Sequence, residues 1–201
     1  MPYYNTARPT ATATAPVAYA IPAAWGEALD NLRRNGVVLR QLAQPRTGSV
    51  EVYTIEDYQS TPKPYEGHYL HSQVKLLAHP AQPLTLEAGT YLAVLAEQGP
   101  AARYLVQALE PQATDSFFAW GFFDSILQQK EHYSDYVFED LAADFLTKNP
   151  AVRQQLNAAK KADPALAANG PAQLEWVYQH SPYAEPGYRR YPVLRWTGPI
   201  N

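Results

Sequence analysis

The chain has 201 residues, of which 46% are hydrophobic, 12% aromatic and 17% charged. A chain of this length buries roughly 70% of the surface that it exposes when unfolded, so it can form a true hydrophobic core. Sixteen Lys and Arg residues against 19 Asp and Glu residues give a net charge of -3, without a basic cluster long enough to follow a phosphate backbone. The composition therefore excludes a disordered chain and argues against nucleic acid as a partner.

The sequence has no cysteine, which excludes disulfides, thiolate metal sites and cysteine nucleophiles but indicates no compartment. The first residues, Met1–Asn5, have neither the basic nor the apolar region of a signal peptide. The longest uncharged aromatic run, Phe117–Phe123, is far shorter than the ~20 apolar residues that span a bilayer. We therefore expect no membrane partner for this chain.

A Thr/Ala/Pro segment precedes the first apolar run. Residues 5–16 alternate Thr and Ala between prolines and have no apolar face, which is typical of an extended, solvated linker. We therefore assign residues 1–16 to a linker, and we expect a further part of the protein upstream of it.

Residues 17–42 have the pattern of one β-α-β unit. Val17–Ile21 is a short apolar run of strand character, and Pro22 suits the first turn of a helix. Trp25, Leu29 and Leu32 follow at helical spacing, and Gly36 supplies a left-handed stop. Val37–Leu42 then predicts a second strand.

The middle of the chain has the period of two that is typical of half-buried strands. Gly48–Ala96 contains several such runs, of which Val50–Ile55 is the clearest. A turn at Ala88-Gly89 separates Leu84–Leu86 from Thr90–Leu95, which predicts a hairpin. We therefore expect an antiparallel sheet here.

The chain becomes helical after Gly99-Pro100. The predicted helices are Ala101–Leu109; Ser116–Gln129, with Asp115 as the N-cap; and Tyr136–Lys148, with Ser134 or Asp135 as the N-cap. Three further segments follow, separated by Asn149-Pro150, Asp163-Pro164 and Gly170-Pro171. Residues 180–201 are rich in Pro and aromatic residues, and we expect an extended tail that packs back onto the domain.

These elements predict an α+β fold, in which the β-α-β start feeds a mainly antiparallel sheet and the C-terminal helices pack on one face. We expect residues 17–201 to form a single α+β accessory domain, with residues 150–201 as a helical and extended tail packed on it. The strand order is not predicted by these patterns.

His68 and His71 form a His-x-x-His pair, a spacing that on a helix could place two imidazoles near one metal ion. The local pattern is that of a strand, however, and residues three apart on a strand point to opposite faces. We therefore expect no metal site at this pair. No helical zinc-peptidase pattern, Gly-rich phosphate loop or nucleophile elbow occurs in the chain.

An aromatic block between carboxylates is the strongest candidate site. Glu110, Asp115 and Asp124 surround the run Phe117–Phe123, which includes Trp120. This arrangement could place paired acids beside a stacking platform for a sugar or a peptide. The favoured interpretation is burial, because Asp115 is explained as a helix cap and aromatic residues on all sides of a helix usually face a core or a neighbouring domain. The candidate interaction or docking residues are Glu110, Phe117, Trp120, Phe123 and Asp124.

Six segments spread over nearly the whole chain carry a family likeness: Val17–Trp25, Pro64–His68, Ala88–Tyr91, Leu109–Asp124, Ser134–Glu139 and Tyr188–Pro192. They resemble the region that follows the catalytic domain in bacterial zinc carboxypeptidase-like proteins of the carboxypeptidase A superfamily, particularly those of the Bacteroidetes type. The Leu109–Asp124 block is the longest and most unusual. One departure is Gly121, where we expect the family to have Asn.

The resemblance implies a non-catalytic C-terminal accessory domain that supports or docks onto a peptidase domain in the same protein. Zinc would be held by that domain, because none of the five histidines here is followed by Glu at the third position. It also implies a bacterial, periplasmic or extracellular protein with a role in proteolysis. Two alternatives remain open: a freestanding module that binds a peptide or a carbohydrate with an aromatic face, and an independent hydrolase that uses the acid pair.

Overall fold

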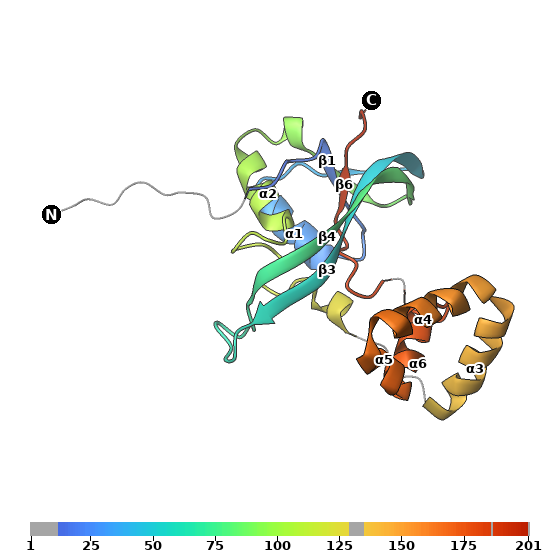
Figure 1. The fold of residues 1–201 in the computed structure, drawn as a ribbon. Coiled ribbons are helices and arrows are strands. Elements are labelled where there is room, and N and C mark those ends of the chain that lie inside the picture. Colours follow the sequence, from blue (N-terminus) through green and yellow to red (C-terminus); the bar gives the residue numbers. More distant parts are fainter. Residues whose placement is uncertain (1–11, 129–134, 186, 201) are drawn as a thin grey trace. The chain divides into compact units, whose positions relative to one another are not determined.

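We analysed a computed structural model, which describes residues 12–128, 135–185 and 187–200 (Figure 1). By its contacts the chain divides into two compact units. Unit 1 comprises residues 1–127 and 189–201, and unit 2 comprises residues 128–188. Residues 17–201, which we expected to form one domain, thus contain unit 2 and most of unit 1. Residues 1–11 of the predicted linker lie outside the described residues, and residues 12–16 form no helix or strand.

The fold is α+β, as predicted, and unit 1 contains a six-stranded sheet with the order β2-β5-β1-β6-β3-β4. All neighbouring strands in this sheet run antiparallel. The strands are β1 (Ala18–Ile21), β2 (Arg40–Gln41), β3 (Arg46–Ser60), β4 (His71–Leu86), β5 (Tyr91–Val94) and β6 (Leu194–Trp196). Figure 1 shows that β3 and β4 are long and strongly curved.

The predicted β-α-β start is present, but its two strands are separated by a third. Helix α1 (Gly26–Arg34) follows β1, and Gly36, with φ 79°, provides the predicted left-handed residue after it. Strands β1 and β2 each pair antiparallel with β5, so they run parallel to one another on either side of it. The second strand is only two residues long, Arg40–Gln41, within the predicted range.

The prediction of a hairpin between Leu84–Leu86 and Thr90–Leu95 is wrong. The chain does turn at Gly89, with φ 88°, but β4 pairs with β3 and β5 pairs with β1 and β2. The physical reason is burial: Leu92, Ala93 and Val94 are apolar on both faces of the strand and are all buried. Such a run favours an interior position between two strands over a position beside the exposed edge of β4.

The predicted helix over Ser116–Gln129 is also wrong. Residues 116–128 form a series of turns that leads into a short 3-10 helix, η3 (Asp124–Leu127), and Gln129 lies outside the described residues. The amide of Phe117 donates to the carbonyl of Ala108, and Gly121 has φ 78°, which interrupts any continuous helical ladder. Asp115 is not a helix cap, because turns and no helix follow it; its carboxylate accepts a hydrogen bond from Gln107 Nε2 at 3.1 Å.

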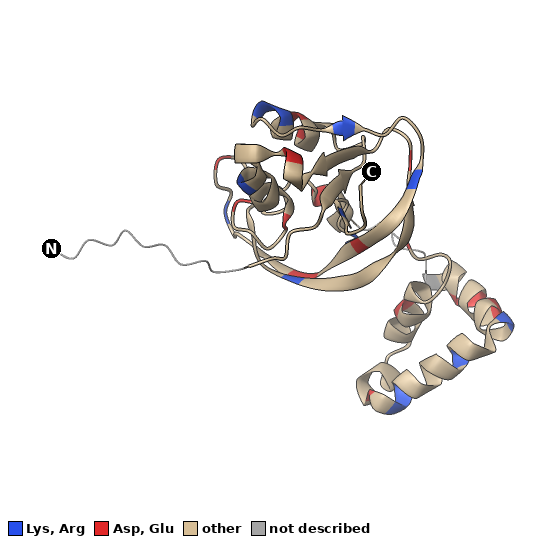
Figure 2. Cartoon of the chain, turned by 90° about the horizontal axis from the view of Figure 1, so that it is seen from above, with Lys and Arg blue, Asp and Glu red and all other residues tan. Residues whose placement is uncertain are grey.

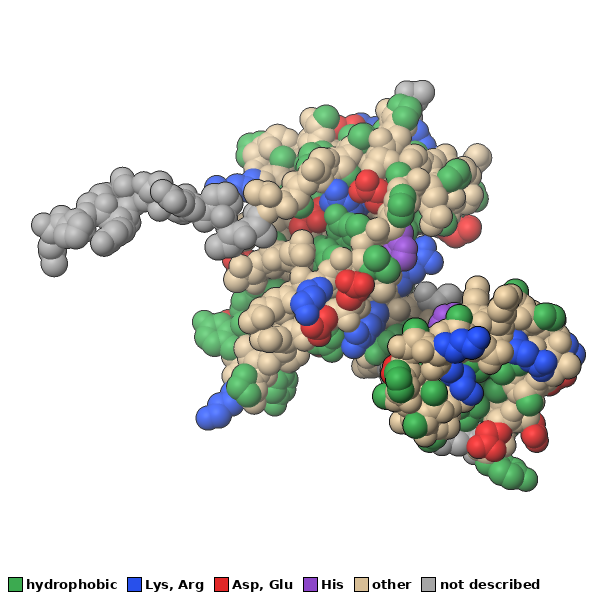
Figure 3. Space-filling model, in the orientation of Figure 1, with side chains coloured by type: hydrophobic (Ala, Val, Ile, Leu, Met, Phe, Trp, Pro, Cys, Tyr) green, Lys and Arg blue, Asp and Glu red, His purple; other side chains and the backbone are tan. Residues whose placement is uncertain are grey.

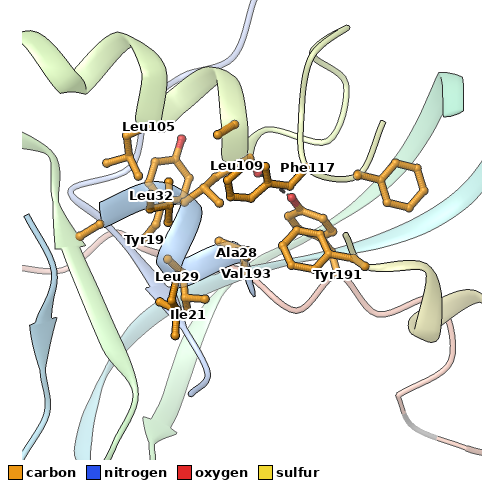
Figure 4. Close-up of a cluster of buried hydrophobic side chains, with 14 of the residues drawn as sticks. Tyr19, Ile21, Ala28, Leu29, Leu32, Leu105, Leu109, Phe117, Tyr191 and Val193 are labelled. Atoms are coloured by element: carbon orange, nitrogen blue, oxygen red, sulfur yellow. Dashed lines mark hydrogen bonds between the residues drawn. The ribbon is translucent and has the colours of Figure 1, made fainter. Parts of the chain in front are cut away.

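The main core of unit 1 lies between the sheet and its helices. Two short 3-10 helices, η1 (Leu95–Glu97) and η2 (Gly99–Ala101), lead into α2 (Ala102–Leu109), which follows the predicted helix closely. Figure 4 shows Tyr19 and Ile21 of β1, Leu29 and Leu32 of α1, and Leu105 and Leu109 of α2 pointing toward one another. The same cluster also includes Phe117, Phe118, Phe123, Tyr191 and Val193.

A second apolar cluster contains the side chains of β1 that alternate with those of the main core. Its buried members are Ala18, Ala20, Val50, Val52, Leu86, Leu92, Val94 and Trp196. The indole of Trp196 packs directly on Gly48, where an added Cβ would lie 2.0 Å from a ring carbon. Glycine at position 48 is therefore required by this close approach.

The C-terminal tail forms an interior strand. We expected residues 180–201 to be extended and packed onto the domain, and Leu194–Trp196 is β6, which lies between β1 and β3. The sheet is therefore completed by the end of the chain.

In the described part of unit 2, residues 135–185, the helices are α3 (Asp135–Lys148), α4 (Pro150–Ala162), α5 (Pro164–Ala168) and α6 (Gly170–Gln179). The first follows the predicted helix, whereas Ser134, one of its two candidate caps, lies outside the described residues. The three Pro-led segments are all helical, and Asp163 and Asn169 cap α5 and α6 by accepting hydrogen bonds from backbone N–H groups. Phe138, Ala142, Leu156 and Val177 form the core of unit 2.

Candidate functional site

Three groups of side chains in unit 1 could carry a function, and the first is a buried ion pair on the sheet. Tyr19, Arg195 and Glu51 lie side by side on β1, β6 and β3, because Arg195 is in register with both neighbours. Glu110, directly after α2, lies over this row. Its Oε1 accepts a hydrogen bond from the Tyr19 hydroxyl at 2.6 Å and another from Arg195 Nη1.

The chemistry of this first group is that of a structural ion pair. Burial raises the pKa of the Glu110 carboxyl, whereas the hydrogen bond from Tyr19 and the charge of Arg195 oppose that rise. Burial and the Glu110 charge also raise the pKa of Tyr19, so its hydroxyl stays protonated as a donor. Because Glu110 is buried and its Oε1 accepts two hydrogen bonds within the protein, it does not face a ligand surface.

Arg195 also fixes the end of the predicted linker. Its Nη2 donates to the carbonyl oxygen of Thr14, and its Nε donates to Glu51 Oε2 at 3.1 Å. Pro16 is buried, and the amide of Val17 donates to the carbonyl of Trp196 at 2.9 Å. The described end of the predicted linker is therefore anchored to the sheet at Thr14.

The second group is a hydrogen-bonded row of Ser60, His71 and Asp124. Ser60 and His71 face each other across the β3/β4 pair, with 2.9 Å between Ser60 Oγ and His71 Nδ1. His71 Nε2 lies 2.9 Å from Asp124 Oδ1, and the backbone N–H of His71 donates to the carbonyl of Ala119. The His71 side chain is 6% exposed and that of Asp124 is 51% exposed.

Two aromatic rings and a glycine set the position of this row. The imidazole of His71 lies against Tyr58 and Phe118, with centroid separations of 4.8 and 5.2 Å. Gly121 allows Asp124 to approach, because a Cβ at position 121 would lie 3.0 Å from Asp124 Oδ2. The row therefore joins the β3/β4 hairpin to the loop that carries Trp120.

The third group is an aromatic surface at the end of the β3/β4 hairpin, which we call the tip surface: Tyr65, His68, Tyr69 and Trp120. Glu66 and Gly67, with φ 48° and 84°, form a tight turn between Tyr65 and His68. The Trp120 ring contacts Tyr65 and His68, with centroids 6.2 and 5.9 Å apart. Tyr65 and Tyr69 are 56% and 55% exposed. Apolar side chains are visible at this end of the hairpin in Figure 3.

The residues singled out from the sequence do not form one platform. Phe117 and Phe123 belong to the buried core, Trp120 is half-buried on the tip surface, and Glu110 belongs to the buried ion pair. The three carboxylates expected near the aromatic run each take a different partner: Glu110 binds Tyr19 and Arg195, Asp115 binds Gln107, and Asp124 binds His71. Burial, the favoured interpretation, describes most of the aromatic run.

The two histidines of the His-x-x-His pair lie in different groups. His68 is exposed on the tip surface, whereas His71 is buried in β4. Across residues 12–128, 135–185 and 187–200, no three His, Cys, Asp or Glu side chains are arranged to hold a metal ion. Lys and Arg are dispersed over the described chain, as Figure 2 shows.

Comparison with known proteins identifies no relative: no family model, curated protein or solved structure matches the chain. Within the described residues, no helix has the length and apolar character needed to cross a membrane.

Proposed function

We propose that this chain is a non-catalytic accessory domain of a zinc carboxypeptidase-like protein and that it docks onto the peptidase domain of that protein through the tip surface. The observation that carries the docking role is the exposure of Tyr65 and Tyr69 beside Trp120. Large aromatic side chains are enriched in protein interfaces, where an apolar ring and a polar end can both be used.

The tip surface is favoured over Phe117 and Phe123, the other two predicted docking rings, because both already pack within unit 1. Phe117 packs against Phe122 with 4.6 Å between ring centroids, and Phe123 packs edge-on against Trp25 at 4.9 Å. These rings stabilise unit 1. Only the half-buried Trp120 of the predicted docking residues adjoins exposed rings.

The tip surface is also held in place before any partner binds. Before Trp120 in the sequence, the carbonyl of Ala119 accepts a hydrogen bond from the His71 amide. After it, the Asp124 carboxylate is hydrogen-bonded to the His71 side chain. Tyr65 and His68 pack on the Trp120 ring. A surface ordered in this way loses less conformational freedom on binding, which favours affinity.

Binding measurements test this role. This chain and the peptidase domain encoded upstream of it are expressed separately, and their dissociation constant is measured by titration calorimetry. We expect Tyr65→Ala and Tyr69→Ala each to weaken binding by about tenfold, which corresponds to ~1.4 kcal/mol. Tyr136→Ala is the matched control, because Tyr136 is an 85% exposed tyrosine in unit 2. Equal affinities for the two tip variants and the wild type would refute docking through the tip surface.

A freestanding binding module for a peptide or a carbohydrate is the second candidate function. It is favoured by the exposed Tyr65 and Tyr69 rings together with the half-exposed carboxylate of Asp124, since stacking rings beside a hydrogen-bond acceptor suit a sugar or a peptide. Binding to a glycan or peptide array that Tyr65→Ala abolishes would favour this function over docking in the same protein.

A further inference from the structure

We propose that Ser60 is a nucleophile, activated by His71 and supported by Asp124, that accepts an acyl or phosphoryl group from an activated donor. This activity is separate from the docking function and does not depend on it; the chain proposed above is non-catalytic only with respect to the peptidase reaction. It rests on the arrangement of the three side chains, which come from β3, β4 and the loop after α2.

The hydrogen bonds define which nitrogen of His71 is the base. An ionised carboxylate accepts hydrogen bonds but cannot donate one. Beside Asp124, the neutral imidazole therefore places its proton on Nε2, 2.9 Å from Asp124 Oδ1. Nδ1 then carries the free lone pair, and it lies 2.9 Å from Ser60 Oγ. The serine hydroxyl therefore donates to a basic nitrogen, as a serine activated for attack does.

The solvent exposure of His71 and Ser60 suits this role. The His71 side chain is 6% exposed and packs against both Tyr58 and Phe118, which favours one orientation of the imidazole. Ser60, at the end of β3, is exposed and can be reached from solvent. A buried base beside an accessible hydroxyl is the geometry required of a nucleophile and its general base.

The transfer of the acyl group to Ser60 needs no change of oxidation state, and its bonds and protons are accounted for by the three residues and the donor. Ser60 Oγ attacks the carbonyl carbon of the donor, its proton passes to His71 Nδ1, and Asp124 stabilises the imidazolium through Nε2–H. The new C–O bond forms as the bond to the leaving group breaks, and the leaving group takes the proton from His71. Water then hydrolyses the ester on Ser60 by the same path in reverse.

The neighbouring backbone restricts the class of donor. The N–H of Thr61 donates to the carbonyl of Leu70, and the N–H of Leu70 donates to Thr61 Oγ1. These two N–H groups are therefore engaged and cannot stabilise a developing oxyanion, as such donors do in hydrolases that have them. The fitting donors are thioesters, aryl esters and phosphorofluoridates, because their leaving groups depart without that help.

Labelling with diisopropyl fluorophosphate tests the proposal on the full chain. Attack by Ser60 forms a P–O bond and releases fluoride, and mass spectrometry of a digest locates the adduct. We expect the adduct on Ser60, its absence in Ser60→Ala, and a rate about tenfold lower in Asp124→Asn, since a half-exposed carboxylate supports the base less than a buried one. Ser72 is the internal control: it is an exposed serine next to His71 whose side chain alternates to the other face of β4.

The pH profile separates an activated serine from a serine that only bonds to a structural histidine. The labelling rate should rise with pH, because only the neutral imidazole has a free lone pair that can accept the Ser60 proton. Circular dichroism confirms that each variant is folded. The proposal is overturned if folded wild-type protein gives no adduct on Ser60, if Ser72 is labelled equally, or if the rate does not change with pH.

Discussion

Unit 1 and unit 2 differ in the contacts that stabilise each of them internally. The helices of unit 2 follow one another along residues 135–179, and its core comes from these successive elements. In unit 1, by contrast, Arg195 at the end of the chain bonds to Glu110 and Glu51, which lie 85 and 144 residues away in sequence. A unit whose contacts are close in sequence can be predicted from short stretches of sequence. A unit that depends on pairs of residues far apart in sequence cannot.

Unit 1 also depends on a segment that follows unit 2 in the sequence. The chain leaves unit 1 after Leu127 and returns at Arg189, whose backbone N–H donates to the carbonyl of Ile126 at 2.8 Å. Strand β6 follows that return. Unit 1 therefore requires its distant C-terminal strand, but nothing in its own sheet comes from unit 2.

Arg195→Ala should have the largest effect, because it removes the residue that joins the end of the chain to the rest of the sheet. Glu110 would remain buried without its cationic partner, which costs about 3–5 kcal/mol. Chemical denaturation of unit 1 gives this loss in the free energy of unfolding. A change below ~1 kcal/mol would show that distant pairing does not stabilise unit 1 as described.

Gly48→Ala should have the next largest effect. The added Cβ would meet the Trp196 indole at 2.0 Å, so β3 or β6 must shift, at a cost of about 1–3 kcal/mol. Gly26→Ala is the matched control, because a Cβ at position 26 meets nothing within 4 Å. Equal denaturation midpoints for the two variants would contradict the close packing of β6 on β3.

Trp120→Ala should destabilise unit 1 by about 0.5–1.5 kcal/mol, the range typical of an aromatic pair beyond simple burial. Trp120 is half-buried and contacts Tyr65 and His68, so its removal loosens the tip surface and leaves the main core intact. Thermal unfolding followed by circular dichroism measures the change. A loss of the size expected for a fully buried Trp would show that Trp120 belongs to the core.

Asp57→Asn should have a smaller effect that depends on pH. The hydrogen bond and charge of Lys75 lower the pKa of Asp57, so the pair contributes stability above the ordinary pKa of Asp and loses it as the pH falls through the lowered value. The wild type and the variant should therefore differ near neutral pH and converge in acid. A difference that grows in acid would have the wrong sign.

Excision of unit 2 should have the smallest effect on unit 1. Replacing residues 128–188 by a short Gly/Ser linker preserves the hydrogen bond between Arg189 and Ile126, since both residues stay in unit 1. Hydrogen exchange should show that the β1 and β6 amides keep their protection. Loss of that protection would mean that unit 1 depends on unit 2.

The same contrast explains what the sequence could predict. Helices α1, α2, α3 and the three Pro-led helices were predicted because proline, capping residues and helical spacing lie within a few residues of each other. The predicted hairpin at Ala88-Gly89 failed because a turn residue does not reveal which strands pair. The three residues of β6 give no pattern of their own, and their partners, β1 and β3, are distant in sequence.

The candidate site was predictable only in part. Asp124 and Trp120 were selected from the aromatic run, but the partner of Asp124 is His71, 53 residues earlier. The pairing of Ser60 with His71 depends on the register of the β3/β4 hairpin, which has shifts at three places. Similarly, Glu110 was selected as an acid beside aromatic rings, whereas its role follows from Arg195, which no local pattern connects to it.

The coding DNA immediately upstream of the Met1 codon provides the most direct test of the proposed accessory role. We predict an uninterrupted open frame that encodes a His-x-x-Glu pair and a later histidine, the zinc ligands that the resemblance implies for the peptidase domain. A ribosome-binding site and an in-frame stop codon directly before Met1 would contradict the account, because no peptidase domain would then share this chain.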